Sequence, residues 1–364
     1  MNIANDKIEE VISHFKITGT LLNIKANREG HINSTFISTF EAGGIIKKYT
    51  HQRINTHVFK HPFEVMENIN AITSHIRKKL IKENCEVTKR CLQVVKTKDN
   101  TLLFVDKVGG HWRTYHFIDD VKTFSTIENE EQAKLLGHAV GQFQLYLSDF
   151  DGTTLHETIP HFHDMTLRYK QLEKAKKVNF NNRIEMVKEE LHFLEVNKER
   201  GQRLWQSMER GLLPVRVTHN DTKMNNVLFS LDGKEALCVI DLDTVMPGTI
   251  LFDTGDMIRT ATNRAAEDET DLNKVECDVA LHKALIQGYL SKALFLTPSE
   301  KELVVESGRN ITQIMAVRFL SDYLNGDIYY HIEREDHNII RARTQIKLIQ
   351  DMDKKWDILT HIEN

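Results

Sequence analysis

The sequence predicts an α+β protein in which a small region of antiparallel strands precedes a larger, mainly helical region. Between about residues 20 and 118, short runs rich in β-branched and aromatic residues are separated by turn residues. After Asp119-Asp120 the apolar residues recur at helical spacing instead. One short apolar run, 236–240, interrupts these helices as a buried-strand candidate. We therefore expect two domains, residues 1–118 and residues 119–364.

The strand-rich region contains a hairpin, a helix and three further strands. Residues 34–40 and 45–50 are strand candidates, and Glu41-Ala42-Gly43-Gly44 supplies the turn that makes them antiparallel. Pro62 predicts a helix that begins after His61. Its apolar face is formed by Val65, Ile69, Ile72 and Ile76. The remaining strand candidates are residues 91–95, 102–105 and 113–118.

The helical region shows apolar stripes at a period close to 3.6 residues. The first stripe consists of Leu136, Ala139, Val140, Phe143 and Leu147. A second is formed by Ile184, Val187, Leu191 and Leu194, and further helical patterns cover residues 275–292 and 299–324. We expect these helices to bury a shared core.

Composition excludes several classes of protein. The formal net charge is −4, from 48 basic and 52 acidic residues, so we expect no nucleic-acid partner and no membrane surface as partner. The four cysteines form no metal-binding pattern, and Cys238 lies inside an apolar run. The first residues lack the basic and apolar parts of a secretory signal, and no apolar stretch reaches transmembrane length. A cytoplasmic protein is expected.

Residues 217–226 carry the pattern that is most informative about chemistry. They contain His-x-Asp-x4-Asn, and the apolar run 236–240 that follows ends at Asp241. This order supplies one carboxylate for an acceptor hydroxyl, and an amide and a second carboxylate for a divalent cation. Phosphoryl transfer needs such groups, because the transferred group carries negative charge that metal ions neutralise. The alternative makes His219 and Asn226 loop hydrogen bonders and Asp241 a cap.

This segment resembles the catalytic and metal-binding loops of the aminoglycoside phosphotransferase family, a branch of the protein-kinase-like fold. Residues 239–248 and 251–256 are similar to the N-acetylhexosamine 1-kinase subgroup in particular. Further similar segments, in the same order along the chain, are Gln52-Arg53-Ile54-Asn55, Trp112-Arg113-Thr114-Tyr115, Ile159-Pro160-His161-Phe162-His163 and residues 318–324. The resemblance implies a bilobal kinase-like fold, with ATP as co-substrate and Mg²⁺ as cofactor.

The resemblance also implies roles in the larger region. Asp221 would accept the proton of the acceptor hydroxyl or orient it, and Lys223 would neutralise the transferred phosphoryl group or simply face solvent. Asn226 and Asp241 would be the Mg²⁺ ligands, since Mg²⁺ prefers oxygen atoms. Structural support is expected from His219, Asp243, Asp253 and Asp256, with Asp243 as an additional metal ligand in the alternative.

Nucleotide contacts are expected in the strand-rich region. Gly30, with His31 and Asn33, occupies the place of a phosphate-covering turn, although a single glycine is also typical of a plain hairpin. Either Gln52 or Arg53 takes the strand position where the family usually has a basic residue. Glu67 is either the ion-pair partner of that residue or a solvated helix charge.

The acceptor is expected to be a small alcohol. Arg318, Asp322 and Tyr323 resemble the segment that lines the subgroup's sugar site, although Arg318 and Asp322 also have the spacing of an ordinary helix pair. The resemblance implies an ATP-dependent kinase that forms the 1-phosphate of GlcNAc or GalNAc. Alternatives are a kinase of choline, homoserine, hydroxylysine, methylthioribose or an aminoglycoside, and a non-catalytic sensor of nucleotide or sugar.

Overall fold

The computed structural model describes residues 5–27 and 32–361, and its internal packing divides the chain into two compact units. The first unit comprises residues 1–122, 149–159 and 228–247. The second comprises residues 123–148, 160–227 and 248–364. This division differs from the single cut expected between residues 118 and 119, because two later segments pack with the first unit.

A buried asparagine explains why those two segments belong to the first unit. Asn68 lies on α2 (Pro62–Lys82) and is 2% exposed. Its Nδ2 donates to the backbone oxygens of His156 (2.8 Å) and Val245 (2.9 Å), and its Oδ1 accepts from the His156 N–H (2.9 Å). A buried amide must find partners for its donors and its acceptor, so these bonds attach both segments to the helix.

A five-stranded antiparallel sheet forms the centre of the first unit. Its strand order is β1-β2-β3-β5-β4. The strands are β1 (Thr20–Asn27), β2 (Ser34–Ala42), β3 (Ile45–Arg53), β4 (Phe104–Val105) and β5 (His111–His116). At the β2–β3 turn, Gly43 and Gly44 have φ of 63° and 80°, which a glycine adopts without strain. The predicted hairpin and its turn are therefore confirmed.

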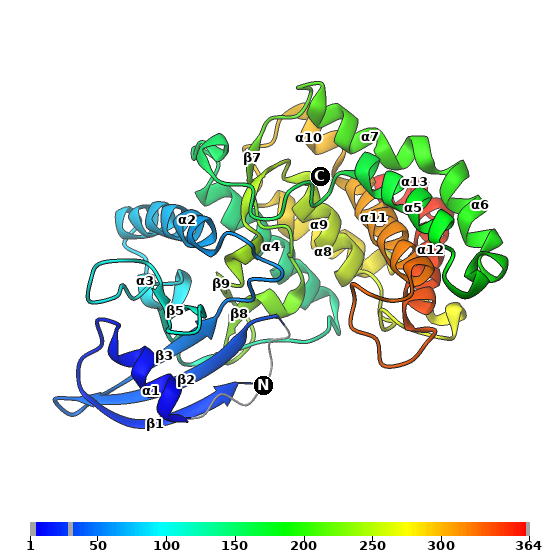
Figure 1. Cartoon of the computed structure of the whole chain (residues 1–364). Helices are drawn as coiled ribbons and strands as arrows, with labels where there is room; N and C mark the ends of the chain where they lie inside the picture. The colour runs from blue at the N-terminus through cyan, green and yellow to red at the C-terminus, as the bar shows by residue number, and fades with distance from the viewer. Residues whose placement is uncertain (1–4, 28–31, 362–364) are drawn as a thin grey trace. The chain divides into compact units, whose positions relative to one another are not determined.

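Helices cover both faces of this sheet (Figure 1). α1 (Asn5–Ser13) buries Ile8 and Val11 in a cluster with Phe36 and Trp112. Successive residues of a strand point to opposite faces, so Arg113 lies on the other face, where it contacts Met66 of α2. The helix predicted after His61 is confirmed, with Pro62 in its first turn.

The strand predicted at residues 91–95 is wrong. Cys91 follows a one-turn helix, α3 (Val87–Arg90), and the segment makes only an isolated bridge from Val94 to Tyr115. Residues 93–95 do lie along β5, where the Val95 N–H donates to the Thr114 oxygen (2.8 Å) and the His116 N–H to the Gln93 oxygen (2.9 Å), but the pairing stops after this single bridge.

A three-stranded sheet of order β6-β8-β9 completes the first unit. Its strands are β6 (Val121–Lys122), β8 (Val227–Ser230) and β9 (Ala236–Val239). Ile118, Leu228 and Cys238 share a small apolar cluster, so Cys238 is a core residue as predicted. The sequence then continues through η4 (Leu242–Thr244), a single 3₁₀ turn, to β10 (Met246–Gly248).

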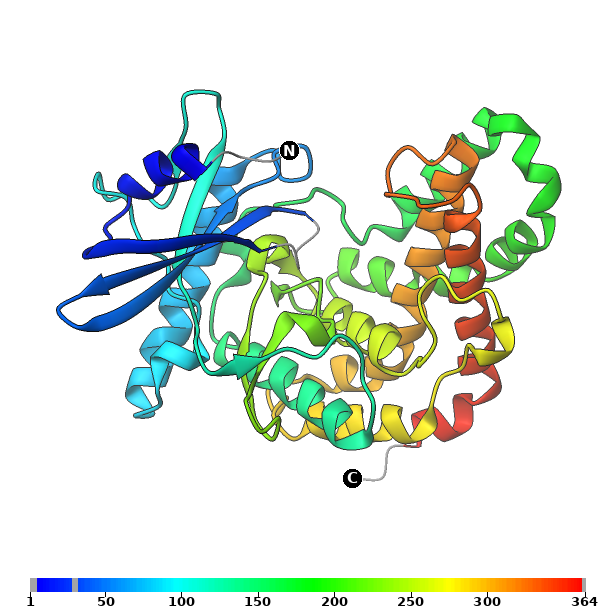
Figure 2. The same ribbon diagram turned by 90° about the horizontal axis from the view of Figure 1, so that it is seen from below.

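The second unit is built around α11 (Val304–Asn325), which is buried on nearly all sides. Figure 2 shows α12 beside it, with the helices of residues 165–209 nearby. The helices of this unit are α4 (Glu130–Tyr146), α5 (Met165–Val178), α6 (Lys188–Val196), α7 (Lys198–Glu209), α8 (Leu251–Ala261), α9 (Val279–Leu290), α10 (Pro298–Glu302), α12 (His337–Lys354) and α13 (Trp356–Thr360). The helices predicted from the first stripe, from residues 275–292 and from residues 299–324 are confirmed.

The stripe from Ile184 to Leu194 does not form one helix. Asn181 and Asn182 have positive φ, and the backbone breaks again at Val187 (φ −131°) before α6 begins. The break at Val187 lies inside the stripe, so two short pieces replace the continuous helix. Among residues 5–27 and 32–361, no helix is both long and apolar enough to cross a membrane.

Candidate active site

Asp221 lies in the second unit, in the loop that follows the short strand β7 (Arg216–Thr218). Its Oδ2 accepts from the Asn226 side-chain amide (2.9 Å) and from the Lys223 ammonium (2.9 Å). The Asn226 amide also donates to the backbone oxygen of Asp221 (2.8 Å). The Asp221 side chain remains 27% exposed. A carboxylate held in one orientation yet open to solvent can receive an acceptor hydroxyl.

Asp253 stabilises this loop through hydrogen bonds to its buried carboxylate. Its carboxylate accepts hydrogen bonds from the backbone N–H groups of His219 (3.0 Å) and Asn220 (2.7 Å) and from the Gln144 side chain (3.0 Å). Asp253 is fully buried, and burial raises the pKa of its carboxyl while these donors and His219 oppose the rise. Asn220 has φ +66°, so the loop turns sharply just before Asp221.

His219 takes part in the same loop through its backbone and its ring. The Nδ1 atom accepts from the Asp221 N–H (3.2 Å), and the ring meets Phe143 of α4 edge to face at 5.8 Å. The side chain is completely buried. These contacts agree with a supporting role for His219 rather than with proton transfer.

Asp256 lies one helical turn after Asp253 on α8 and is paired with Arg259. Its Oδ1 accepts from Arg259 Nε (3.2 Å) and Nη2 (2.9 Å), while Oδ2 is buried with no hydrogen-bond partner among the described residues. Burial raises the pKa of Asp256, and the negative charge of Asp221 adds to the rise. The positive charge of Arg259 therefore lies close to the Asp221 loop.

Oxygen atoms suited to Mg²⁺ come from Asn226 and Asp241. Because the Asn226 amide hydrogens point to Asp221, its Oδ1 is the atom left for a cation. Asp241, in the first unit, is exposed and has φ +60°, ψ +57°, a strained conformation for a non-glycine residue. β8 begins one residue after Asn226, and β9 ends two residues before Asp241. No group of three His, Cys, Asp or Glu side chains with metal-site geometry occurs in the described part of the chain.

Asp243 is the centre of a buried network in the first unit. Its Oδ1 accepts from Arg113 and its Oδ2 from the Asn33 amide (2.7 Å). Arg113 is 2% exposed. Burial disfavours its charge, but the carboxylate of Asp243 holds the pKa of Arg113 above its ordinary value. Asp243 is therefore engaged by the protein, which agrees with structural support, and the additional metal ligand of the alternative stays a prediction.

The side chains of Gln52 and Arg53 point to opposite faces of the sheet. The sequence left open which of the two takes the position of the family's basic residue. Gln52 lies beside Arg113 and accepts from its Nε (3.0 Å) and Nη2 (2.8 Å). Arg53 lies opposite Trp112 in the register, so its side chain points to the face with α1, next to Gly110 and Asp106. The basic group on the α2 face of this sheet is thus Arg113 of β5, and Gln52 binds it.

The structure gives the partners of two other residues expected at the nucleotide, and for Glu67 it agrees with the alternative of a solvated helix charge. Glu67 bonds to His156 (2.8 Å) rather than to a basic strand residue, and both side chains are largely exposed. Asn33 donates to Asp243 and accepts from the Asn55 N–H (2.9 Å), so its side chain is used inside the unit. Gly30 and His31, the other residues of the expected phosphate-covering turn, lie outside the described residues.

Arg318 is surrounded by aromatic rings. Its guanidinium carbon lies 5.2 Å from the ring centre of Phe162, 5.9 Å from Tyr329 and 5.5 Å from Tyr330. Asp322 accepts from backbone N–H groups and from the Asn338 amide rather than from Arg318, so the helix pair does not form. Cation–π contacts stabilise a guanidinium without cancelling its charge.

Asp322 and Tyr323 do not join Arg318, contrary to the expectation. Asp322 is 4% exposed and accepts the backbone N–H groups of Ile328, Tyr329 and Tyr330. It therefore folds the loop that brings the two tyrosines back onto Arg318. Tyr323 is buried in the core, where Arg183 stacks at 4.3 Å from its ring.

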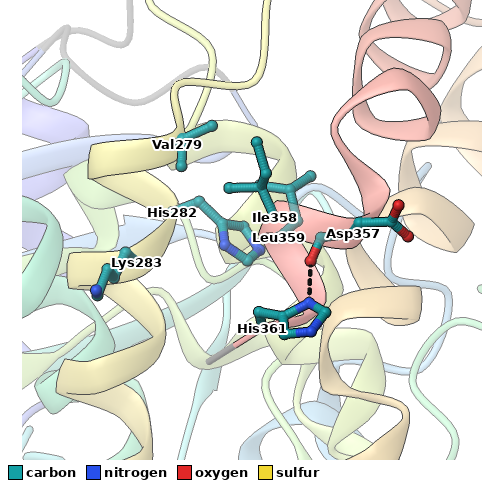
Figure 3. A pocket seen from close by; sticks show the side chains of 7 residues that line it. All are labelled: Val279, His282, Lys283, Asp357, Ile358, Leu359 and His361. Atoms are coloured by element: carbon teal, nitrogen blue, oxygen red, sulfur yellow. Dashed lines mark hydrogen bonds between the residues drawn. The ribbon is translucent and has the colours of Figure 1, made fainter. Parts of the chain in front are cut away.

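Sequence reasoning missed several residues of these sites. Asn68, Gln144 and Arg113 are polar or charged residues on elements that read as ordinary helix and strand, and their function depends on partners far along the chain. Tyr329 and Tyr330 had a weak signal, an aromatic pair shortly after Asp322. A pocket of about 390 Å³ between α9 and α13 contains none of the predicted residues (Figure 3). It is lined by Val279, His282, Lys283, Asp357, Ile358, Leu359 and His361.

Comparison with known proteins defines the class first. The fold is similar to an aminoglycoside phosphotransferase from Alicyclobacillus acidocaldarius, with a TM-score of 0.61 at 11% identity over 97% of this chain and 94% of that one. It is also similar to choline kinase from Cryptosporidium parvum Iowa II (TM-score 0.54, 16% identity, 99% and 98% covered). Spectinomycin phosphotransferase, solved with ADP and spectinomycin, gives 0.55 at 12% identity, with 100% of this chain and 99% of that one covered. The chain therefore has a kinase-like fold.

The family follows from the sequence itself. Residues 23–290 match the phosphotransferase enzyme family, which is well over half of the chain. The protein belongs to that family. The match includes the Asp221 loop, Asp241 and the sheet that carries Arg113.

Proposed function

We propose that the protein is an ATP- and Mg²⁺-dependent kinase whose acceptor is a neutral sugar, in the first place the anomeric hydroxyl of an N-acetylhexosamine. Family membership supports the phosphotransferase activity. The observation that carries the acceptor class is Arg318, which has a ring cage but no carboxylate partner among the described residues. The segment 318–324 also resembles the N-acetylhexosamine 1-kinases.

Charge around Arg318 argues against an amine acceptor. Arg168 lies nearby and donates from Nη2 to the Phe162 carbonyl (2.6 Å). Burial and the charge of Arg318 lower the pKa of Arg168 to about 10. Burial, with the charges of both arginines, also holds the pKa of His163 well below its ordinary value. An ammonium group would be repelled by this excess of positive charge, whereas sugar hydroxyl and amide oxygens accept hydrogen bonds from guanidinium groups.

The residues of the Asp221 loop supply the remaining chemistry. Asp221 would orient the acceptor hydroxyl for in-line attack on the γ-phosphate and take its proton as the new O–P bond forms and the bond between the γ-phosphorus and the leaving ADP breaks. Lys223, which is bonded to Asp221, would offset the negative charges of the Asp221 carboxylate and of the γ-phosphate as the phosphate approaches the acceptor. Asn226 Oδ1 and the Asp241 carboxylate fit Mg²⁺ as oxygen ligands, and the ion when bound would neutralise the nucleotide phosphates.

The proposal is tested by ADP release with ATP and Mg²⁺, using acceptors that differ in charge. The panel pairs GlcNAc with glucosamine and GalNAc with galactosamine, and adds glucose, choline, homoserine and kanamycin. We expect turnover of the N-acetylhexosamines, with an anomeric phosphate in the phosphorus NMR spectrum. Repulsion of about 1–3 kcal/mol should make kcat/KM roughly tenfold or more lower for each amino sugar. Preference for choline or kanamycin would refute the neutral-acceptor class and leave the kinase activity standing.

Arg318→Gln should raise KM for the N-acetylhexosamine by roughly tenfold while kcat changes little. The reason is that the lost contact binds the acceptor equally in the ground state and in the transition state. The discrimination against glucosamine should shrink in the same variant. Arg343→Gln is the control, since Arg343 lies on the neighbouring α12 and pairs at the surface with Glu190 (2.5 Å). Equal KM values in the two variants would show that Arg318 does not face the acceptor.

Asp241→Ala should weaken binding of Mg²⁺-nucleotide far more than binding of nucleotide without metal. Removal of a direct carboxylate ligand takes away one of the few protein oxygen atoms that the ion receives. Isothermal titration calorimetry with ADP, with Mg²⁺ or with EDTA, measures both affinities. If the loss were the same with and without Mg²⁺, Asp241 would not be a metal ligand.

A further inference from the structure

In the first unit, Asp243 joins three segments that are distant in sequence. Its Oδ1 accepts a hydrogen bond from Arg113 of β5, and its Oδ2 accepts one from the side-chain amide of Asn33, which lies just before β2. Both Asp243 and Arg113 are 2% exposed. A buried carboxylate is stable only where charge and hydrogen bonds compensate it, so these partners fix the position of Asp243.

Arg113 is itself held in one orientation. Gln52 accepts from two of its nitrogen atoms, and the Gln52 amide donates to Thr35 Oγ1 (3.2 Å). The planar guanidinium therefore presents Nη1 to Asp243 while its other edge is bound to β3. Binding Gln52 and Asp243 at the same time needs the planar guanidinium of arginine, with N–H donors on two edges. A lysine ammonium is a single point charge and cannot bind both in this way.

The segment around Asp241 is consequently fixed on both sides. Asp243 anchors η4 to the sheet, and the Val245 carbonyl accepts from Asn68 of α2 (2.9 Å). Asp241 precedes η4 in a left-handed conformation, with φ +60°. A non-glycine residue keeps that conformation only where its surroundings over-determine it. The network around Asp243 is such a surrounding.

We infer that Asp243, held by Arg113 and Asn33, is a positioning residue that presets Asp241 for the metal and ties the turn before β2 to the metal-binding segment. The inference rests on the proposed function, in which Asp241 binds Mg²⁺. The basic group that this family usually carries on the third strand is here a buried arginine on the adjacent strand. Its task is to hold a carboxylate of the protein, since its guanidinium is enclosed by Gln52, Asp243 and Met66.

The test compares how much Mg²⁺ improves ADP affinity in matched variants. Isothermal titration calorimetry gives the ratio of the ADP dissociation constant in EDTA to that in Mg²⁺. Arg113→Met should lower this ratio about 10–100-fold, as expected for loss of a partner behind a metal ligand. Arg113→Lys should lie between Arg113→Met and the wild type, because it keeps the charge and loses the planar guanidinium.

Two further variants guard against misfolding as the cause. Asn33→Ala removes only the bond to Asp243 and the bond from Asn55, and it leaves the buried ion pair in place. It should lower the ratio by a smaller factor than Arg113→Met does, and it should lower the thermal midpoint less, because the buried ion pair remains. Lys48→Met is the control, because Lys48 on β3 makes an exposed ion pair with Asp119 (2.6 Å) in the same unit. It should leave the ratio as in the wild type.

The outcomes separate the two proposals. A wild-type protein whose ADP affinity does not depend on Mg²⁺ would overturn the proposed function itself. A wild-type protein with a clear Mg²⁺ gain, and the same gain in Asn33→Ala and Arg113→Lys, would overturn the positioning role alone. The positioning role is supported if the Mg²⁺ gain in ADP affinity is unchanged in Lys48→Met and falls progressively in Asn33→Ala, Arg113→Lys and Arg113→Met.

Discussion

Replacing Asp221 by Asn is expected to lower kcat by roughly 10²–10⁴-fold, the usual effect of removing a positioned general base. Asparagine has the same shape, so one oxygen can still accept from Asn226 and the loop should keep its fold. What is lost is the negative charge and the ability to take the proton of the acceptor hydroxyl. Affinity for Mg²⁺-ADP should remain largely intact, because this carboxylate acts mainly in the transition state.

The measurement is steady-state ADP release with saturating ATP and acceptor, together with calorimetric binding of Mg²⁺-ADP. Asp232→Asn is a suitable control, since Asp232 is an exposed carboxylate in the turn between β8 and β9. Near-normal turnover in Asp221→Asn would rule out the role assigned to Asp221. Loss of nucleotide binding in step with turnover would indicate a folding defect of the loop instead.

Asp253→Ala is expected to have the largest effect on stability. The substitution leaves the backbone N–H groups of His219 and Asn220, and the Gln144 amide, without their acceptor in a fully buried place. Unsatisfied buried donors cost about 1–3 kcal/mol each, so the free energy of unfolding should fall by about 3–5 kcal/mol. Turnover should fall with it, because the same bonds shape the turn before Asp221.

Urea unfolding followed by circular dichroism measures this loss. Asp357→Ala is the control, because Asp357 is exposed on α13 in the same unit. Asp253→Asn should be intermediate, since one side-chain oxygen remains to accept from the two backbone groups. An Asp253→Ala protein with wild-type stability and reduced turnover would mean that Asp253 acts on the chemistry rather than on the fold.

Local pattern was enough for much of the fold. The β2–β3 hairpin followed from β-branched strands around Gly43 and Gly44, and α2 followed from Pro62 and its apolar spacing. The strand at residues 91–95 failed because apolar character alone does not show how far a segment pairs with its neighbour, and here the pairing is limited to one bridge. The stripe at residues 184–194 failed because the backbone leaves the helical region at Val187 (φ −131°), inside a pattern that otherwise suits a helix.

The candidate site divides in the same way. Asp221 and Asn226 are five residues apart, so the sequence motif already contains the pair that the structure joins at 2.9 Å. Glu67 and Tyr323 were misplaced because a charge or a ring on a helix can face several neighbours. Packing turns Glu67 toward His156 and Tyr323 toward Arg183.

The sequence by itself determined the family, the change from a strand-rich to a helix-rich region, and the loop that carries Asp221, because each depends on residues close together in the chain. Only the tertiary structure decided that Gln52 binds Arg113 of β5, and that Tyr329 and Tyr330 enclose Arg318. It also decided that Asp243 and Asp253 are enclosed by donors from distant segments. Burial is the physical reason, because a charged side chain removed from water needs partners that the fold brings to it. The spacing of residues along the sequence does not show which distant residues these partners are.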